Sequence, residues 1–227
     1  LSIIIDHFVD EFRQPSSSLS ACLALSTATL LPRSSIMITL ASFVESLKAP
    51  HIVGICGSNR VGSYNRMLLE NATAALEEQG ASVEIIDLAS LQLPLYDPAI
   101  ESSDFPPAAK LLKEKLTAAD GLIFTCPEFN GGITPLLCNS ITWATRGEGG
   151  MYDGFKGKIA TAMAASPGML GGMRVVVNLQ NLLQDMGCII VNSHVNVGRA
   201  MTAFSEDGVL TDERAKSKLT TAVHQLV

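Results

Sequence analysis

Short apolar runs alternate with helical patterns along most of this chain, and this alternation limits its fold more than any other feature. The apolar runs lie at 51–56, 82–88, 121–126, 158–165 and 189–195, and the helical patterns at 63–79, 107–118, 134–146, 172–186 and from 211 onward. Five nearly continuous apolar strands separated by helices indicate a parallel sheet that helices cover on both faces. The sequence therefore predicts an α/β fold.

The first 48 residues have a different composition from the rest of the chain. Between Arg13 and Val44 there is no acidic residue, whereas Ser, Thr, Ala and Leu are frequent. Such a segment is typical of organelle transit peptides, but Met37 offers the alternative of a later start with the preceding residues untranslated. We therefore expect an N-terminal extension at 1–48 and one domain at 49–227. The location expected is cytoplasmic, or mitochondrial or plastid if the extension is a transit peptide.

Composition and charge exclude several classes of function. The uncharged run 14–32 contains seven Ser or Thr and ends in proline, so we expect no membrane span. A net charge of −6 argues against a nucleic-acid partner, because phosphate backbones require a basic face. The five cysteines have irregular spacing without a CxxC pair, which predicts neither a disulfide framework nor a metal site. Reduced thiols are typical of intracellular proteins.

Two doubly wound layouts are compatible with the strand and helix pattern. A dinucleotide-binding fold would place GxGxxG after the first strand, but the chain reads Gly54-Ile-Cys-Gly57-Ser-Asn there. A flavodoxin-like sheet, with five parallel strands in the order 2-1-3-4-5, places its ligand chemistry after the first and third strands. Those loops read GSNRVGSYNR (57–66) and CPEFNGGITP (126–135), rich in polar and glycine residues. The flavodoxin-like layout is therefore favoured.

The first loop has the residue types that bind a terminal phosphate. Ser58 and Ser63 supply hydroxyls, Asn65 an amide and Arg60 a guanidinium, and the next helix begins among them. Helix N-termini and charge-assisted hydrogen bonds both favour a dianion. Two simpler interpretations stay open, because Ser63 could be only a helix N-cap and Arg60 a solvated charge.

Together the two loops resemble the NADPH-dependent FMN reductase family, which includes chromate, quinone and azo-dye reductases. Its usual pattern is GSxRxxSxN followed by PEYN, a later proline and a Lys-Asn near a tryptophan. The matching positions are Gly57, Ser58, Arg60, Ser63, Asn65, Pro127, Glu128, Phe129, Asn130, Pro135, Asn139 and Trp143. Phe129 replaces the usual tyrosine, and Cys138 stands where lysine is usual. The likeness covers about residues 51–200.

The resemblance implies a binding site for FMN made by three loops. The phosphate would lie on Ser58, Arg60, Ser63 and Asn65, with Tyr64 in the same loop, and the isoalloxazine against Pro127, Glu128, Phe129, Asn130 and Gly131. A third loop, SPGMLGG (166–172), resembles the family's turn of small residues, where Ser166, Gly168 and Gly171 would let the backbone approach the ring. Glycine also suits an ordinary turn before a helix. Glu128 is expected either near the flavin edge or as a helix-capping acid.

The family resemblance also implies the activity. We expect an FMN-dependent NAD(P)H oxidoreductase that passes hydride to quinones, free flavin or similar small acceptors, with NADPH or NADH as donor and no catalytic side chain. The alternative is a flavodoxin-like electron carrier or FMN-binding module. His194 is expected in the core. Relatives usually form homodimers or homotetramers, and Trp143 is expected either at such an interface or in the core.

Overall fold

The computed structural model describes residues 48–227, so the expectations for the N-terminal extension lie outside the described residues. The strands are β1 (His51–Cys56), β2 (Ser82–Ile86), β3 (Gly121–Thr125), β4 (Ile159–Ala165), β5 (Ile189–Ile190) and β6 (Val195–Val197). The helices are α4 (Tyr64–Glu77), α5 (Pro98–Ser103), α6 (Pro107–Ala118), α7 (Pro135–Ala144), α8 (Met173–Asp185), α9 (Ala200–Ala203) and α10 (Glu213–His224).

The strands form one parallel sheet in the order β2-β1-β3-β4-β5, which confirms the flavodoxin-like prediction. Cys56 at the end of β1 is in register with Thr125 at the end of β3, and Thr125 is in register with Met163 of β4. The loops that follow these three strands therefore leave the sheet along one edge, called the carboxyl edge below.

The fifth strand differs from its prediction, because it is divided into β5 and β6, both paired with β4. Ile189 pairs with Ile159, thirty residues earlier, whereas Val195 pairs with Met163, thirty-two residues earlier. Two additional residues must therefore leave the ladder between the two strands. In this stretch His194 is exposed, so the prediction that it lies in the core is wrong.

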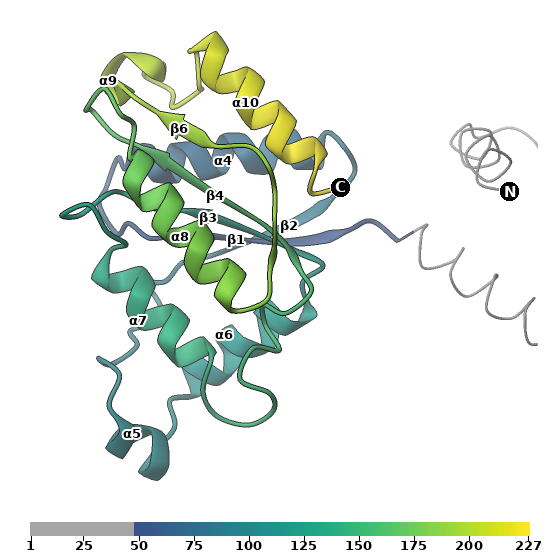
Figure 1. Ribbon diagram of the computed structural model, residues 1–227, viewed down its shortest axis with the longest axis vertical. Helices are drawn as coiled ribbons and strands as arrows, with labels where there is room; N and C mark the ends of the chain where they lie inside the picture. The colour runs from purple at the N-terminus through teal and green to yellow at the C-terminus, as the bar shows by residue number, and fades with distance from the viewer. Residues whose placement is uncertain (1–47) are drawn as a thin grey trace, which may run out of the picture. The chain divides into compact units, whose positions relative to one another are not determined.

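Helices cover both faces of the sheet, as Figure 1 shows. One core cluster lies under α4 and α10 and includes Leu68, Leu69 and Leu219, and the other lies under α6, α7 and α8. All five residues of β3 are buried, which explains why this strand reads as an uninterrupted apolar run. The sheet is thus packed between two apolar layers, and the carboxyl-edge loops leave it from between them.

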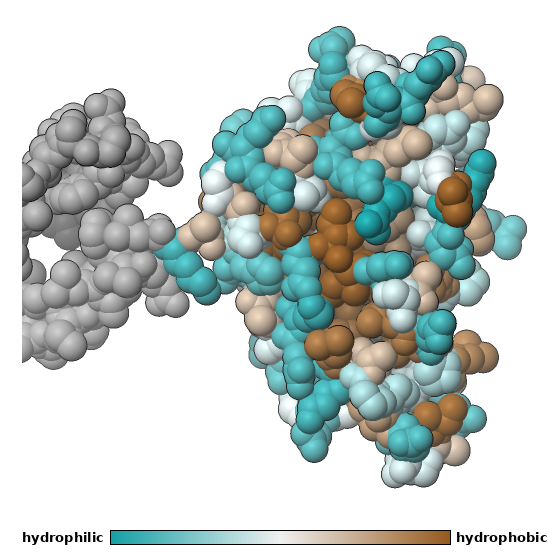
Figure 2. Space-filling view, turned by 180° about the vertical axis from the view of Figure 1, so that it is seen from behind, coloured by the Kyte–Doolittle hydropathy of each residue, from teal (hydrophilic) through white to brown (hydrophobic). Residues whose placement is uncertain are grey.

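The edge strand β2 pairs with β1 alone. Seen from behind, where this edge of the sheet lies, apolar residues gather in the middle of the face (Figure 2). Val83 and Ile85 of β2 are half-buried and pack on the cluster under α4 and α10. Among residues 48–227, no helix has both the length and the apolar character that crossing a membrane requires.

Candidate functional site

The loop after β1 is fixed to the loop after β3 through Gly57. Its N–H donates to the Thr125 carbonyl at 2.7 Å, and its carbonyl accepts from Thr134 Oγ1 at 2.7 Å. A Cβ added at Gly57 would lie 3.0 Å from Thr134 Oγ1 and 3.1 Å from Cys126 Sγ. A side chain at this position would push the two loops apart, so glycine allows their backbones to lie this close together.

The start of α4 presents unpaired donors at the carboxyl edge. Ser63 is the N-cap of α4, since its Oγ accepts from Arg66 N at 3.4 Å. Within the described residues, the backbone N–H groups of Tyr64 and Asn65 donate to no acceptor. These two N–H groups, together with the positive end of the helix dipole, form a site suited to an anion.

Ser58 and Arg60 lie in the same loop, directly before this helix. Ser58 is half-buried, and its Oγ accepts from Arg60 N at 3.4 Å, which tightens the turn. The Arg60 side chain is exposed, and no carboxylate in residues 48–227 pairs with it. A hydroxyl, an uncommitted guanidinium and two backbone donors are a donor set that fits a phosphate monoester.

Asn65 is buried and ties this loop to the end of β4. Its Nδ2 donates to the Ala165 carbonyl at 2.9 Å, and its Oδ1 accepts from Ala165 N at 2.9 Å. Beside it, the Tyr64 ring stacks on Phe204 with the ring centres 5.9 Å apart. Both side chains therefore hold the loop after β1 against the β4–α9 side of the molecule.

The loop after β3 contains a tight hairpin at Phe129–Gly132. The backbones of Phe129 and Gly132 exchange hydrogen bonds of 3.1 and 2.8 Å, and Asn130 and Gly131 have φ values of 53° and 77°. Two central residues with positive φ characterise a type I′ turn, for which Asn-Gly is a preferred sequence. The turn leaves the Phe129 side chain 56% exposed at the carboxyl edge.

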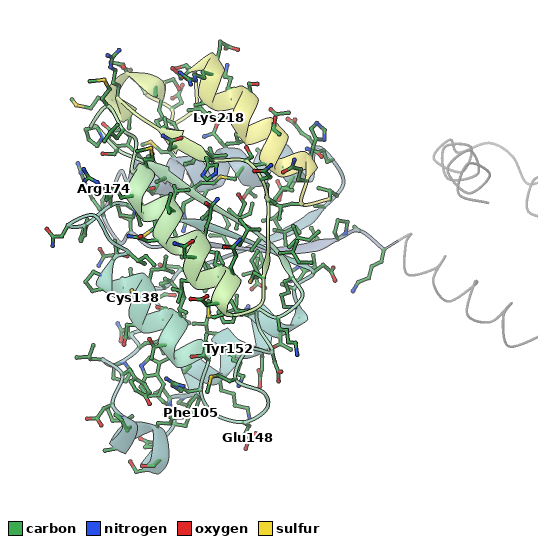
Figure 3. All side chains as sticks on the ribbon, viewed as in Figure 1. Phe105, Cys138, Glu148, Tyr152, Arg174 and Lys218 are labelled. Carbon is green, nitrogen blue, oxygen red and sulfur yellow. The ribbon has the colours of Figure 1, made fainter. Side chains whose placement is uncertain are left out.

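Glu128, which precedes this hairpin, caps helix α8. Its Oε2 accepts from the backbone N–H groups of Arg174 and Val175 at 3.1 and 3.4 Å, and its Oε1 accepts from Arg174 Nη1 at 3.1 Å. The Glu128 side chain is 18% exposed and the Arg174 side chain 65% exposed; Arg174 is labelled in Figure 3. Of the two roles expected for Glu128, the structure shows the helix-capping one. The half-buried Pro127 precedes it and leads out of β3.

The third loop packs closely on the end of β6. A Cβ added at Gly171, where φ is 60°, would lie 2.6 Å from the Gly198 nitrogen and 2.7 Å from the Val197 carbonyl carbon. At the other end of the loop, Ser166 Oγ accepts from Gly168 N at 3.2 Å. Packing within the chain therefore requires glycine at Gly171, whereas a Cβ added at Gly168 would meet only Ser166 Oγ, at 3.5 Å.

Sequence reasoning missed the turn between β6 and α9, because it depends on the division of the fifth strand. Arg199 in this turn has φ 49°, an uncommon conformation for a residue with a side chain. Its N–H donates to the Gly168 carbonyl at 3.1 Å, so this turn supports the third loop. The positive φ is not visible in the sequence, since nothing marks Arg199 as a turn residue.

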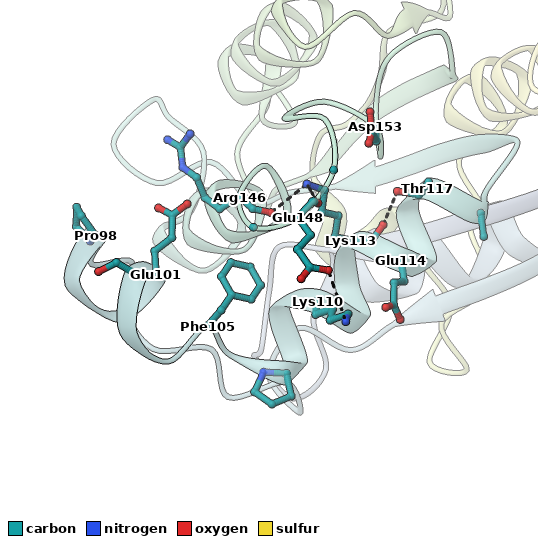
Figure 4. A pocket seen from close by; sticks show the side chains of 15 residues that line it. Pro98, Glu101, Phe105, Lys110, Lys113, Glu114, Thr117, Arg146, Glu148 and Asp153 are labelled. Atoms are coloured by element: carbon teal, nitrogen blue, oxygen red, sulfur yellow. Dashed lines mark hydrogen bonds and ion pairs between the residues drawn. The ribbon is translucent and has the colours of Figure 1, made fainter.

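A separate cavity of about 1190 Å³ lies between α5, α6 and the segment 146–153, away from the predicted site residues, none of which line it (Figure 4). Beside it, Trp143 is fully buried and packs against the rings of Tyr96 and Phe105. Trp143 is therefore a core residue of the chain. Lys113 closes one wall by donating to the carbonyls of Arg146 and Glu148 at 3.1 and 2.8 Å.

The parallel order 2-1-3-4-5, with unpaired backbone N–H groups at the helix start after β1 and two tight loops beside it, defines a flavodoxin-like α/β protein. The chain belongs to the NADPH-dependent FMN reductase family, whose model matches residues 50–202. It is accordingly an oxidoreductase that depends on FMN and NAD(P)H.

Individual proteins of known type agree with this assignment. The chain is 35% identical over 166 residues to an NAD(P)H-dependent FMN reductase of Pseudomonas aeruginosa, covering 73% of this chain and 86% of that protein. It is 33% identical to an NAD(P)H:quinone oxidoreductase of Solanum tuberosum, covering 74% and 86%. Among solved structures, the flavoenzyme NAD(P)H:acceptor oxidoreductase of Paracoccus denitrificans superimposes with a TM-score of 0.68 at 26% identity, covering 78% and 95%.

Proposed function

We propose that this protein binds FMN along the carboxyl edge and uses NADPH or NADH to reduce quinones, free flavin or similar small acceptors. The observation that carries the proposal is the unpaired donor set at the start of α4. Ser58, Arg60 and the N–H groups of Tyr64 and Asn65 would hold the phosphate there, with Ser63 maintaining the helix start as its N-cap. The backbone N–H groups and the dipole at a helix N-terminus both favour binding of a phosphate.

The other two loops would receive the isoalloxazine. In the loop after β3 the ring would lie against Pro127, Glu128, Phe129, Asn130 and Gly131, and in the third loop against Ser166, Gly168 and Gly171. The tight turns of both loops leave backbone close to the edge, which suits a flat ring. When bound, FMN would accept hydride from the nicotinamide and supply it to the acceptor, so the chain contributes position and electrostatics without a catalytic side chain.

Asn65 and Glu128 would act by holding these loops in position. Asn65 fixes the first loop to Ala165 at the start of the third loop, and Glu128 fixes the second loop to the start of α8. The three loops would thus form one preorganised site, because these side-chain-to-backbone hydrogen bonds hold them in place. Preorganisation reduces the cost of ordering the loops when a ligand binds.

The function is tested by purifying the full chain and recording its visible spectrum before and after addition of FMN. We expect flavin absorbance that stays with the protein, and consumption of NADPH or NADH when a soluble quinone is added. The alternative function, a one-electron carrier, predicts flavin binding with reduction of a cytochrome but no nicotinamide turnover. Absence of flavin binding at micromolar FMN would contradict both.

We also propose that the chain forms a homodimer or homotetramer through the segment 142–155. Trp143 itself is buried, but Met151 and Tyr152 in this segment are 51% and 39% exposed, and large exposed apolar side chains favour an interface. Light scattering of the wild type and of Met151→Asp tests this proposed assembly. The variant should have the smaller mass, because the charge would disrupt the interface. A wild-type monomer would contradict the proposal.

The proposed location is the cytoplasm. The four cysteines in the described part of the chain are free thiols, as is usual in reducing compartments. Fluorescent fusions of the full sequence and of residues 49–227 would test this location. Organelle import that requires residues 1–48 would instead support a transit peptide.

A further inference from the structure

A cavity of about 300 Å³ lies where β6 ends and α10 begins. Arg199, Arg214 and Lys218 line it, together with a single carboxylate, that of Asp212. Three cations and one anion give its wall a net charge of +2, although the chain as a whole carries −6. Such a local reversal of charge indicates a site for an anion.

The cations are directed to this cavity from separate elements. Arg199 lies in the turn after β6, whereas Arg214 and Lys218 are one turn apart on α10, where Lys218 is labelled in Figure 3. Lys218 Nζ donates to Asn196 Oδ1 at 3.2 Å, which holds the ammonium at the cavity wall. In residues 48–227 none of the three cations forms an ion pair with a carboxylate.

Asp212 has a structural role that limits its effect on an anion. Its Oδ1 accepts from Ala215 N at 2.8 Å, so the carboxylate is engaged as the N-cap of α10. The positive end of this twelve-residue helix faces the same corner and partly offsets the negative charge of Asp212. The cavity therefore stays favourable for an anion.

The cavity shares a wall with the loop that the proposed function places against the isoalloxazine. Met169 of that loop lines it, the Leu170 carbonyl accepts from Asn196 Nδ2 at 3.0 Å, and the Gly168 carbonyl accepts from Arg199 N at 3.1 Å. The third loop therefore connects the proposed isoalloxazine position with this cavity.

We propose that this cavity binds a phosphate monoester, and that its ligand is the 2′-phosphate of NADPH, so that the protein selects NADPH over NADH. The inference rests on the proposed function, which supplies the nicotinamide dinucleotide. Arginine forks suit the oxygens of a phosphate dianion, and the volume is small for a ligand cavity and suits a phosphorylated ribose better than a whole dinucleotide.

Steady-state kinetics with each nicotinamide separately test the assignment. Arg214→Ala and Lys218→Met each remove one cation, and kcat/KM for NADPH should fall about tenfold while kcat/KM for NADH stays unchanged. Lys216→Met is the matched control, because Lys216 pairs with Glu213 at 2.9 Å and does not line the cavity. Equal losses for both nicotinamides, or an unchanged NADPH value, would overturn the inference.

Calorimetry with fragments separates this inference from the proposed function. The full chain should bind 2′,5′-ADP at least tenfold more tightly than 5′-ADP, and Arg214→Ala should remove the difference. A protein that binds FMN and oxidises NADH but does not distinguish the two fragments overturns the inference alone. Preference for 2′,5′-ADP without FMN binding supports the phosphate site and contradicts the proposed function. Inorganic phosphate that binds as tightly as 2′,5′-ADP would overturn the assignment to a nucleotide.

Discussion

Asn65 and Ala165 are 100 residues apart in the sequence, yet the side-chain amide of the first satisfies both backbone groups of the second at 2.9 Å. Asn65 lies in the first turn of α4, the helix after β1, and Ala165 ends β4. These two strands are separated by β3 in the sheet. The pair therefore spans the middle of the carboxyl edge and fixes two of the three candidate loops to each other.

Replacing Asn65 by alanine should destabilise the protein by at least about 2 kcal/mol, because each buried backbone group left unpaired costs about 1–3 kcal/mol. Urea unfolding measures the change in free energy of unfolding. Asn178→Ala is the matched control, since Asn178 is exposed and donates one bond, to the Gly131 carbonyl, at 2.9 Å. The Asn178→Ala variant should lose less than about 1 kcal/mol of unfolding free energy. Similar losses for the two variants would mean that Asn65 does not hold the loops.

Replacing Arg60 by alanine tests the proposed phosphate site. Loss of a charge-assisted contact worth roughly 1.5–3 kcal/mol should weaken FMN binding on the order of 10- to 100-fold. Binding of riboflavin, which has no phosphate, should weaken much less. Arg66→Ala is the control, because Arg66 pairs with Glu70 at 2.9 Å on the same helix. Titration of each apoprotein with both ligands decides between the outcomes. Equal losses for FMN and riboflavin would show that Arg60 acts through loop structure.

Glu128 and Arg174 should contribute unequally to stability although they pair with each other. Glu128→Ala removes the acceptor for two backbone N–H groups at the start of α8, and we expect a loss of about 1–2 kcal/mol. Arg174→Ala removes only an exposed ion pair, which is worth less than about 1 kcal/mol. Urea unfolding of both variants measures this order. A larger loss for Arg174→Ala would contradict the helix-capping role.

Replacement by alanine should reduce the stability of the protein by different amounts at two glycines that have positive φ. At Gly62, where φ is 68° and a Cβ would meet nothing within 4 Å, the cost should be that of the left-handed conformation alone, about 1–2 kcal/mol. At Gly171 a Cβ would also meet the backbone of Val197 and Gly198, so the loss should reach about 3 kcal/mol or more. Thermal and urea unfolding compare the two variants. Equal losses in the free energy of unfolding would show that the third loop shifts to accommodate the additional Cβ without strain.

Stability should decrease at alkaline pH partly through Cys188. Burial raises the pKa of its thiol from 9.0 to about 11, against the opposing effect of nearby Lys158. The folded state therefore disfavours the thiolate, so this contribution to stability is complete below pH 9 and is lost as the pH rises to about 11. Free energies of unfolding at pH 8, 9.5 and 11 should fall less steeply in Cys188→Ala than in the wild type. Parallel slopes would contradict this expectation.

The sequence by itself determined the features that depend on neighbours along the chain. The apolar runs specify buried parallel strands, Ser63 specifies a helix start, and Asn130-Gly131 suits a type I′ turn. The two loop motifs were sufficient to indicate the family and the strand order. These features are predictable because hydrophobic periodicity, capping and turn preference act over a few residues.

Only the tertiary structure decided how distant residues meet. The partner of Asn65 is a backbone group, which has no sequence signal, and the capping role of Glu128 requires α8 to begin beside the loop after β3. The division of the fifth strand follows from its register against β4. The same division sets the turn that carries Arg199 to the cavity beside Lys218. Register and helix packing are fixed by burial of the whole core, so they depend on many residues together and not on any local pattern.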